Sequence, residues 1–197
     1  MSSTDASIAA RSGGSSLLSR TVPEVPPKLV KDVLPEAILS TEVALSVVTK
    51  ENPGEITLQS SNIVKIGSVT NLGHLRKLDL SFNPIKSLNN IDSFPLLRQM
   101  SMYACNITDI DDVKYIPKVE VLLLQQNEIG KIAFGFEKLN KLKKLRLDHN
   151  KITEISNLQN CTSLQTLDLS WNAISSLEGI EGKIEINILA NIFYNSD

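Results

Sequence analysis

The sequence is poor in the residues that mark several common classes of protein. Its 197 residues include two cysteines and two histidines, and no set of them has the spacing of a zinc site or a disulfide framework. No apolar run reaches the roughly 18 residues of a membrane-spanning helix. The first residues also lack a basic stretch followed by an apolar one, so no secretory signal is predicted. We therefore expect no metal and no membrane insertion.

Charge of either sign is not in excess. The chain has 20 basic and 22 acidic residues, for a net charge of −2. A nucleic-acid surface requires a basic excess, so no nucleic-acid partner is predicted. The Gly13-Gly14 pair is not followed by the Lys-Ser/Thr of a phosphate-binding loop, so no nucleotide cofactor, and indeed no cofactor, is expected.

What the sequence does contain is a repeat. Residues 75–85 read L-x-x-L-x-L-x-x-N-x-I, and the pattern returns at intervals of 22, 22, 23 and 22 residues. Five copies in phase are strong evidence for a repeat architecture. A weaker copy precedes them at Ile56, and the extra residue of the longer copy falls between Ile132 and Phe136. The full copies begin at Leu75, Leu97, Val119, Leu142 and Leu164.

Each part of the repeat has a physical reason. Leu78 and Leu80 alternate with a polar residue, so both face one side of a short strand. The Asn83 slot carries a donor and an acceptor for backbone groups where the strand ends. Cys105 takes that slot in one copy. We expect short parallel strands near 56–58, 78–80, 100–102, 122–124, 145–147 and 167–169.

The second half of each copy has apolar residues three apart, as at Ile85, Leu88 and Ile91. This period favours a 3₁₀ or loosely extended return segment over an α-helix. Turns must stack to share one core, and strands stack about 4.8 Å apart, closer than the return segments. The sequence therefore predicts a curved α/β solenoid, with a parallel sheet on the concave side and 3₁₀ and loop segments on the convex side.

These features resemble leucine-rich repeat proteins of the 22-residue class, which include the regulatory subunit of type-1 protein phosphatase and the outer-arm dynein light chain. The resemblance covers roughly residues 55–180. It implies a non-enzymatic, intracellular and cytoplasmic adaptor that binds a protein through the concave face. It also suggests a ciliary or cytoskeletal assembly. The alternatives are a phosphatase regulatory subunit and the N-terminal fragment of a larger protein or enzyme.

The chain divides into four regions. Residues 1–27 are rich in Ser, Gly and Pro and predict a disordered tail. Residues 28–54 predict an N-terminal cap with a helix that begins near Ser40. Residues 55–180 hold about six repeats. Residues 181–197 are a degenerate C-terminal edge, because Lys183 falls where the repeat needs an apolar residue.

The strand positions beside the leucines form three columns on the concave face, and most are polar, as expected of a solvated surface. Apolar residues interrupt them in adjacent turns, followed by two basic residues. Exposed apolar groups beside basic ones predict a partner-binding hot spot; the alternative is that the aliphatic residues only raise strand propensity. Two aromatics on the rim complete the set, although packing on the next turn is their stronger interpretation. The candidate partner-binding residues are Tyr103, Val121, Leu123, Lys144, Arg146, Phe82 and Trp171.

Two other motifs are predicted to carry no function. Asp148, His149 and Asp168 have the residue types of an acid–base set, but an open sheet offers no pocket to shift a pKa, so we expect solvated residues and no catalytic site. Residues 131–134 match the basic–aliphatic–x–aromatic motif that docks on type-1 phosphatase. Such motifs bind as free strands, whereas Ile132 occupies a buried slot of the repeat.

Overall fold

A computed structural model of the chain describes residues 37–48 and 51–176. The tail predicted over 1–27 and the degenerate edge predicted over 181–197 lie outside the described residues, as do 28–36 of the predicted cap. The described residues hold the remainder of that cap and almost all of the repeats.

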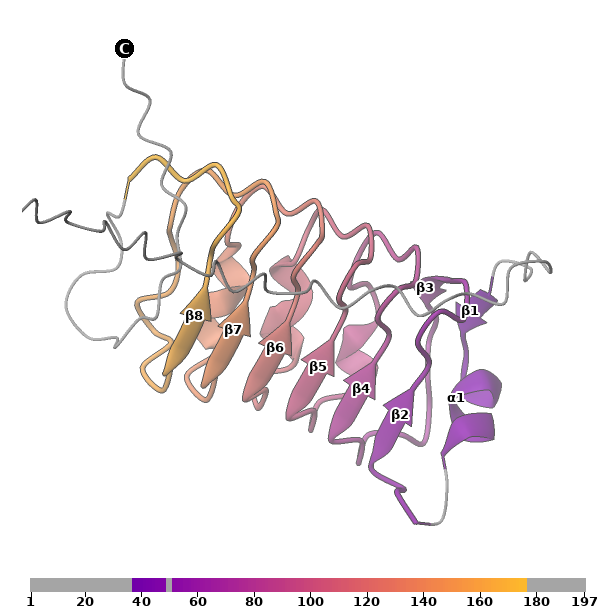
Figure 1. The fold of residues 1–197 in the computed structure, drawn as a ribbon. Coiled ribbons are helices and arrows are strands. Elements are labelled where there is room, and N and C mark those ends of the chain that lie inside the picture. The colour runs from indigo at the N-terminus through magenta and orange to yellow at the C-terminus, as the bar shows by residue number, and fades with distance from the viewer. Residues whose placement is uncertain (1–36, 49–50, 177–197) are drawn as a thin grey trace, which may run out of the picture. The chain divides into compact units, whose positions relative to one another are not determined.

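The concave side is a six-stranded parallel sheet whose strands follow one another in chain order (Figure 1). Neighbours pair one repeat apart, with Ile56 opposite Leu78 and Leu145 opposite Leu167. Each assigned strand begins one residue before the predicted position, although hydrogen bonding continues to the next residue, as from Leu80 N to Ser101 O at 2.9 Å. The strands are β2 (Glu55–Thr57), β4 (Lys77–Asp79), β5 (Gln99–Ser101), β6 (Val121–Leu123), β7 (Lys144–Arg146) and β8 (Thr166–Asp168).

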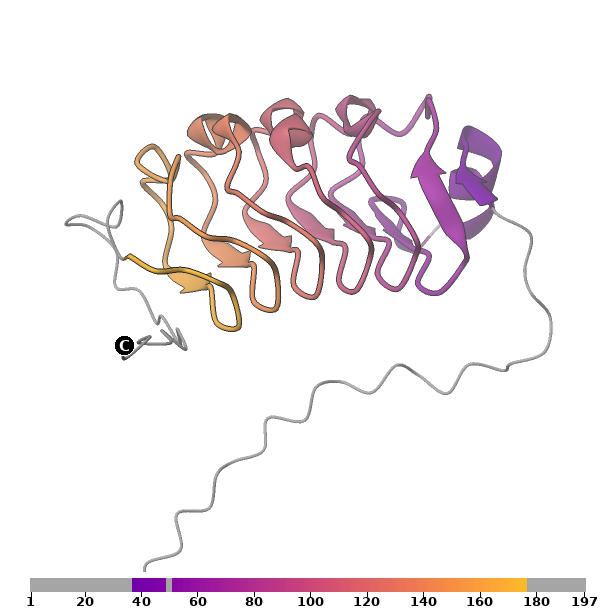
Figure 2. The same cartoon turned by 90° about the horizontal axis from the view of Figure 1, so that it is seen from above.

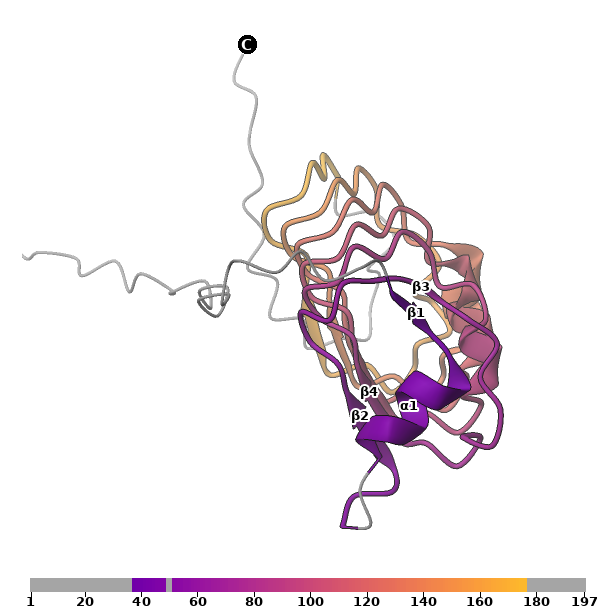
Figure 3. The same ribbon diagram turned by 90° about the vertical axis from the view of Figure 1, so that its right-hand side faces the viewer.

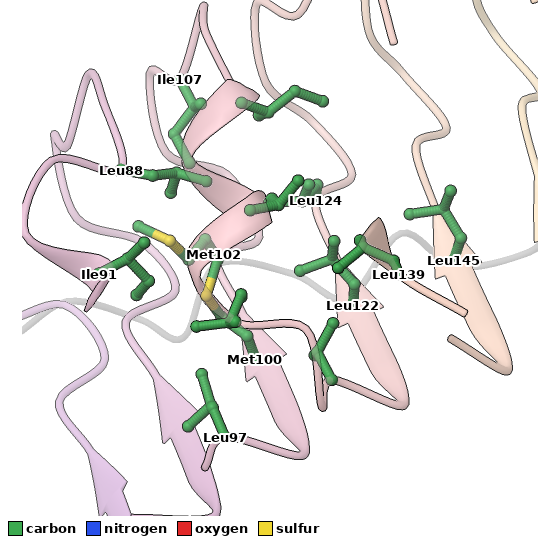
Figure 4. Close-up of a cluster of buried hydrophobic side chains, with 14 of the residues drawn as sticks. Leu88, Ile91, Leu97, Met100, Met102, Ile107, Leu122, Leu124, Leu139 and Leu145 are labelled. Atoms are coloured by element: carbon green, nitrogen blue, oxygen red, sulfur yellow. The ribbon is translucent and has the colours of Figure 1, made fainter. Parts of the chain in front are cut away.

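The convex side carries short 3₁₀ helices, as the period of three predicts. They are η1 (Ile91–Ser93), η2 (Asp111–Tyr115) and η3 (Phe134–Lys138), and Figure 2 shows them in a row opposite the sheet. Apolar residues from both sides fill the space between, among them Ile91 and Leu139 from the convex side and Met100 and Leu122 from the strands (Figure 4). The predicted curved solenoid is confirmed.

The longer repeat places its extra residue at η3. Ile132 and Phe136 keep their buried slots, while Phe134 between them is 73% exposed. Gly135 makes this possible, since a Cβ there would lie 2.1 Å from the Asp111 carbonyl oxygen of the preceding turn. The Gly135 amide instead donates to Asp111 Oδ1 at 2.9 Å.

The first described residues contain the predicted helix and, before it, a strand that the sequence pattern does not indicate. Helix α1 (Thr41–Val47) is capped by Ser40, whose side chain accepts a hydrogen bond from Val43 N. It lies beside β2 at the end of the sheet (Figure 3). Strand β1 (Ala37–Leu39) pairs in parallel with β3 (Ile63–Ile66). The first return segment is thus extended, and its apolar residues Ile63, Ile66 and Val69 stay buried three apart, as the period of three predicts.

The Asn slot links each turn to the one before it. Asn127 Nδ2 donates to the carbonyl oxygens of Met102 at 2.8 Å and Leu124 at 3.0 Å, and its Oδ1 accepts from Ile107 N at 3.0 Å. Asn83, Asn150 and Asn172 repeat this arrangement. The side chain thus satisfies backbone groups that leave the ladder and would otherwise be buried unpaired.

Cys105 fills the slot with a donor alone. Its Sγ donates to Leu80 O at 3.4 Å. The thiol is a weak acceptor, and the Ile85 amide turns to Asn83 O at 2.8 Å within its own turn. The backbone groups next to Cys105 therefore remain hydrogen-bonded although this turn lacks the Asn side chain.

We expect Leu145→Ala to lower the free energy of unfolding by about 2–5 kcal/mol, because Leu145 is fully buried in a close-packed core. Lys144→Ala, one residue away on the exposed face, should change it by less than about 0.5 kcal/mol. Urea denaturation of both variants measures the difference. Equal losses would contradict the observed register.

Replacing Asn127 by Ala should cost about 3 kcal/mol, because it strands the Ile107 amide and two carbonyl groups in the interior. Cys105→Ala is the matched control at the same slot of the preceding turn, where only a weak thiol donor is lost, and about 1 kcal/mol is expected. The two denaturation midpoints test the role of the slot; a smaller loss for Asn127→Ala would refute it.

Candidate functional site

The third concave column is polar, but most of it is not solvated. Its members from the second strand onward are Ser81, Tyr103, Gln125, Asp148 and Ser170, and each is 2–9% exposed. They lie just beyond the strands, where neighbouring turns are joined by hydrogen bonds such as that between the Ser81 and Ser101 hydroxyls at 2.8 Å. The prediction of a solvated face is therefore wrong for these residues.

The prediction of an exposed Tyr103 is also wrong. The side chain is 7% exposed, and its ring meets the Phe82 ring edge-on, with the centroids 4.9 Å apart. Phe82 thus packs on the neighbouring turn, in agreement with the stronger interpretation of that residue. Burial raises the pKa of the Tyr103 hydroxyl, with a further rise from the Asp148 carboxylate and an opposing effect of Arg146. The main role of the Tyr103 ring is therefore to pack against Phe82 within the protein.

Val121 and Leu123 remain on the surface of β6. Both are half-buried, on either side of the fully buried Leu122. We call these two residues the β6 pair. Two residues further along the chain, Gln125 Oε1 is a buried acceptor with no hydrogen-bond donor among the described residues. The middle of the sheet therefore presents partly exposed aliphatic surface on its open face.

The two predicted basic residues differ in their environment. The Arg146 guanidinium binds both carboxylate oxygens of Asp148 at 2.9 Å, and its Nε lies 3.7 Å from Asp168 Oδ2. Lys144 is exposed and forms no ion pair with any described residue. Arg146 is thus already neutralised by two carboxylates, which corrects the expectation of a free basic pair. Lys144 alone is available to a partner.

Asp148 differs from the solvated residue that the sequence predicts, whereas the His149 side chain is 37% exposed. The Asp148 side chain is 6% exposed and lies 3.2 Å from His149 Nδ1, in addition to its two bonds to Arg146. The His149 ring stacks on Trp171, with centroids 5.3 Å apart and planes at 21°, and Trp171 itself is 55% exposed. With its oxygens occupied by Arg146 and His149, Asp148 acts as the centre of an ion-paired cluster.

The rim column has an unusual backbone that the sequence does not indicate. All six residues before the Asn slot adopt left-handed φ angles of 50–60°, although none is Gly, Asn or Asp, the residues that adopt this conformation most readily. The next turn holds them in place, as when Phe82 N donates to Tyr103 O at 2.8 Å. The six are Ser60, Phe82, Ala104, Gln126, His149 and Trp171.

The described residues contain no group of three His, Cys, Asp or Glu side chains placed to hold a metal ion. Within the same part of the chain, no helix is long and apolar enough to cross a membrane. The phosphatase-docking match at 131–134 is not a free strand, because Ile132 is fully buried while Phe134 is exposed. The concave surface around the β6 pair is therefore the remaining candidate site.

Comparison with known families identifies the repeat. A family model described as "Leucine rich repeat" matches residues 117–174, and a second with the same description matches residues 73–92. Among solved structures, InlP of Listeria monocytogenes superposes with a TM-score of 0.57 at 28% identity, over 67% of this chain and 38% of that one. A leucine-rich repeat protein of Leptospira interrogans gives 0.53 at 25% identity, over 58% and 30%.

Two curated relatives are similar in sequence. Mouse mimecan is 29% identical over 175 residues, covering 79% of this chain and 57% of mimecan. The Arabidopsis thaliana protein phosphatase 1 regulatory inhibitor subunit PPP1R7 homolog is 30% identical over 108 residues, covering 52% of this chain and 33% of its own length. The chain thus spans between a third and somewhat over half of these relatives.

The two cysteines should be unreactive in the folded protein. Both thiols are free and buried, and burial raises the pKa of Cys105 and of Cys161 to about 11. The thiolate is the reactive form, so at pH 8 only about one thiol in a thousand is ionised. We expect almost no labelling by a maleimide at pH 8 and two labels per chain in denaturant. Rapid labelling of the native protein would contradict the burial.

Proposed function

Because the chain is a leucine-rich repeat protein, we propose that it is a non-enzymatic adaptor that holds a protein partner on its concave sheet. Proteins with this repeat are generally protein-binding scaffolds, since stacked turns create an extended concave surface. The proposal assigns no chemistry to the chain. It assigns a binding surface centred on β6, with Lys144 beside it and the rim aromatics Phe82 and Trp171 at its border.

The observation that carries the proposal is the β6 pair. A single strand in the middle of the sheet presents two aliphatic side chains on its open face, while the facing positions of β5 and β7 are polar or charged. An apolar group of a partner would remove this surface from water, and central anchors of that kind typically contribute about 2 kcal/mol or more each.

We place this adaptor in the cytoplasm, in a ciliary or cytoskeletal assembly. The resemblance to the outer-arm dynein light chain supports the assembly. The free, buried cysteines Cys105 and Cys161 are consistent with a reducing compartment.

A phosphatase regulatory subunit is the second candidate function. It is supported by the similarity to the Arabidopsis phosphatase 1 regulatory subunit homolog. This candidate predicts that the catalytic subunit of type-1 phosphatase co-purifies with the chain. The chain covers 57% of mimecan and 33% of the Arabidopsis relative, which also fits the third interpretation, the N-terminal fragment of a larger protein or enzyme.

The test is a double substitution, Val121→Ser with Leu123→Ser, in the full chain. Affinity capture and mass spectrometry identify the partner, and titration of the purified partner then gives Kd. We expect Kd to rise by at least about tenfold, because two apolar anchors are lost. The melting temperature should fall only modestly, since both side chains are half-buried on the open face of the sheet and outside the core.

The matched control replaces two exposed aromatic residues of the convex side, Tyr115→Ser with Phe134→Ser. This control should bind the partner as the wild type does. Tyr103→Ala is not suitable, because its burial predicts loss of stability. Unchanged affinity in the β6 variant would reject the concave-face proposal.

A further inference from the structure

A row of charged side chains runs along the edge of the sheet where the strands begin. Backbone hydrogen bonds join the residues of this row from turn to turn. Arg98 N donates to Arg76 O at 2.7 Å, Glu120 N to Arg98 O at 2.7 Å, and Lys143 N to Glu120 O at 2.8 Å. Residues one repeat apart are therefore stacked directly along the solenoid. Side chains far apart in the sequence form one edge.

This edge is basic although the chain is not. The edge consists of three rows of residues in the six-stranded sheet. They are the first residue of each strand, the residue immediately before it and the residue three positions before it. These three rows hold seven cations and two carboxylates, an excess of five positive charges, whereas the whole chain has a net charge of −2. The rest of the chain therefore has a net charge of −7. We call the cations the basic edge: Arg76, Lys77, Arg98, Lys118, Lys141, Lys143 and Lys144.

The two carboxylates are already engaged. Glu120 receives Arg98 Nη1 at 2.8 Å and Lys143 Nζ at 2.7 Å, and hydrogen bonding to Lys143 lowers the pKa of Glu120 most, with Arg98 adding to the effect. Glu55 pairs with Lys77 at 3.3 Å.

Four cations of the basic edge stay unpaired with any described carboxylate: Arg76, Lys118, Lys141 and Lys144. All four are exposed. The opposite ends of the strands have a net charge of −2, from Asp79, Asp148 and Asp168 against Arg146, which pairs with Asp148 and lies near Asp168. The concave sheet is thus charged with opposite sign along its two edges.

We propose that the basic edge binds an acidic segment of the protein partner, one rich in Asp and Glu, lying along the solenoid axis. The inference deepens the proposed function and rests on it. Lys144 is opposite Val121 in the register of β6 and β7, so the basic edge is continuous with the β6 pair. The acidic strand ends would repel the same segment, and charge of this kind fixes the orientation of a partner.

The size of the surface sets the length of the segment. From Arg76 to Lys143 the chain advances three turns, or roughly 15 Å at the usual strand spacing. About five residues of extended chain span that distance. A nucleic acid fits less well, because stacking on aromatic side chains is how single strands are usually held, and among the described residues none of these three rows contains an aromatic residue other than His74.

The test reverses three unpaired charges, Lys118→Glu, Lys141→Glu and Lys144→Glu, in the full chain. A matched control reverses three exposed lysines elsewhere, Lys65→Glu, Lys86→Glu and Lys131→Glu, so both variants have the same net charge. The probe is a fluorescein-labelled peptide of about ten residues rich in Glu and Asp, titrated by anisotropy at low and at physiological salt.

We expect the edge variant to bind the acidic peptide roughly tenfold more weakly than the control, the sum of three exposed ion pairs. Binding to the wild type should weaken as salt rises. Equal losses in the two variants would overturn the inference, because net charge alone would then explain binding. Tighter binding of an oligothymidylate of equal charge would also overturn it and assign the edge to nucleic acid.

The two proposals fail separately. If the β6 variant loses the partner while the edge variant binds the peptide and the partner as the control does, the proposed function stands and the basic edge carries nothing. If the edge variant alone loses the acidic peptide and the β6 variant retains the partner, the concave anchor is wrong. Melting temperatures of all variants exclude a loss of fold.

Discussion

The stacking of each turn on the next is the constraint on which the whole structure depends. A single turn has apolar residues on the inner side of its strand and of its return segment, and it can bury them only between neighbouring turns. The row of Asn side chains makes this stacking specific, because each side chain bonds backbone groups of two successive turns. Strand register, curvature and the shared core all follow from the stacking of the turns.

Stacking also decides which polar residues are surface and which are structure. Side chains just beyond the strands are close to their counterparts in the next turn, so a Ser, Asp or Tyr there is buried and bonded within the protein. Asp148 illustrates the result: it is held by Arg146 and His149 rather than exposed to solvent. The surface that is left for a partner is narrower than the full set of concave positions, and it centres on β6 and the strand starts.

The same stacking also arranges charged side chains in rows, so that local charge differs from the net charge of the chain. Residues one repeat apart, such as Arg98, Glu120 and Lys143, become direct neighbours and pair with one another. Where cations recur in the same row without a carboxylate, charge accumulates along one edge. The exposed surface therefore has an apolar centre and edges of opposite sign, an arrangement that favours one orientation of a bound segment.

The sequence by itself determined the repeat, the concave parallel sheet, the 3₁₀ return segments and the capping helix, because periods of two and three and a fixed 22-residue interval are local properties of the chain. It also located the buried slots of Ile132 and Leu145. The pairing of β1 with β3, the left-handed rim at residues such as Phe82, and the burial of Tyr103 and Asp148 were decided only by the tertiary structure. Each of these depends on the residues that lie one turn away, and their distance and orientation are set by stacking rather than by the segment itself.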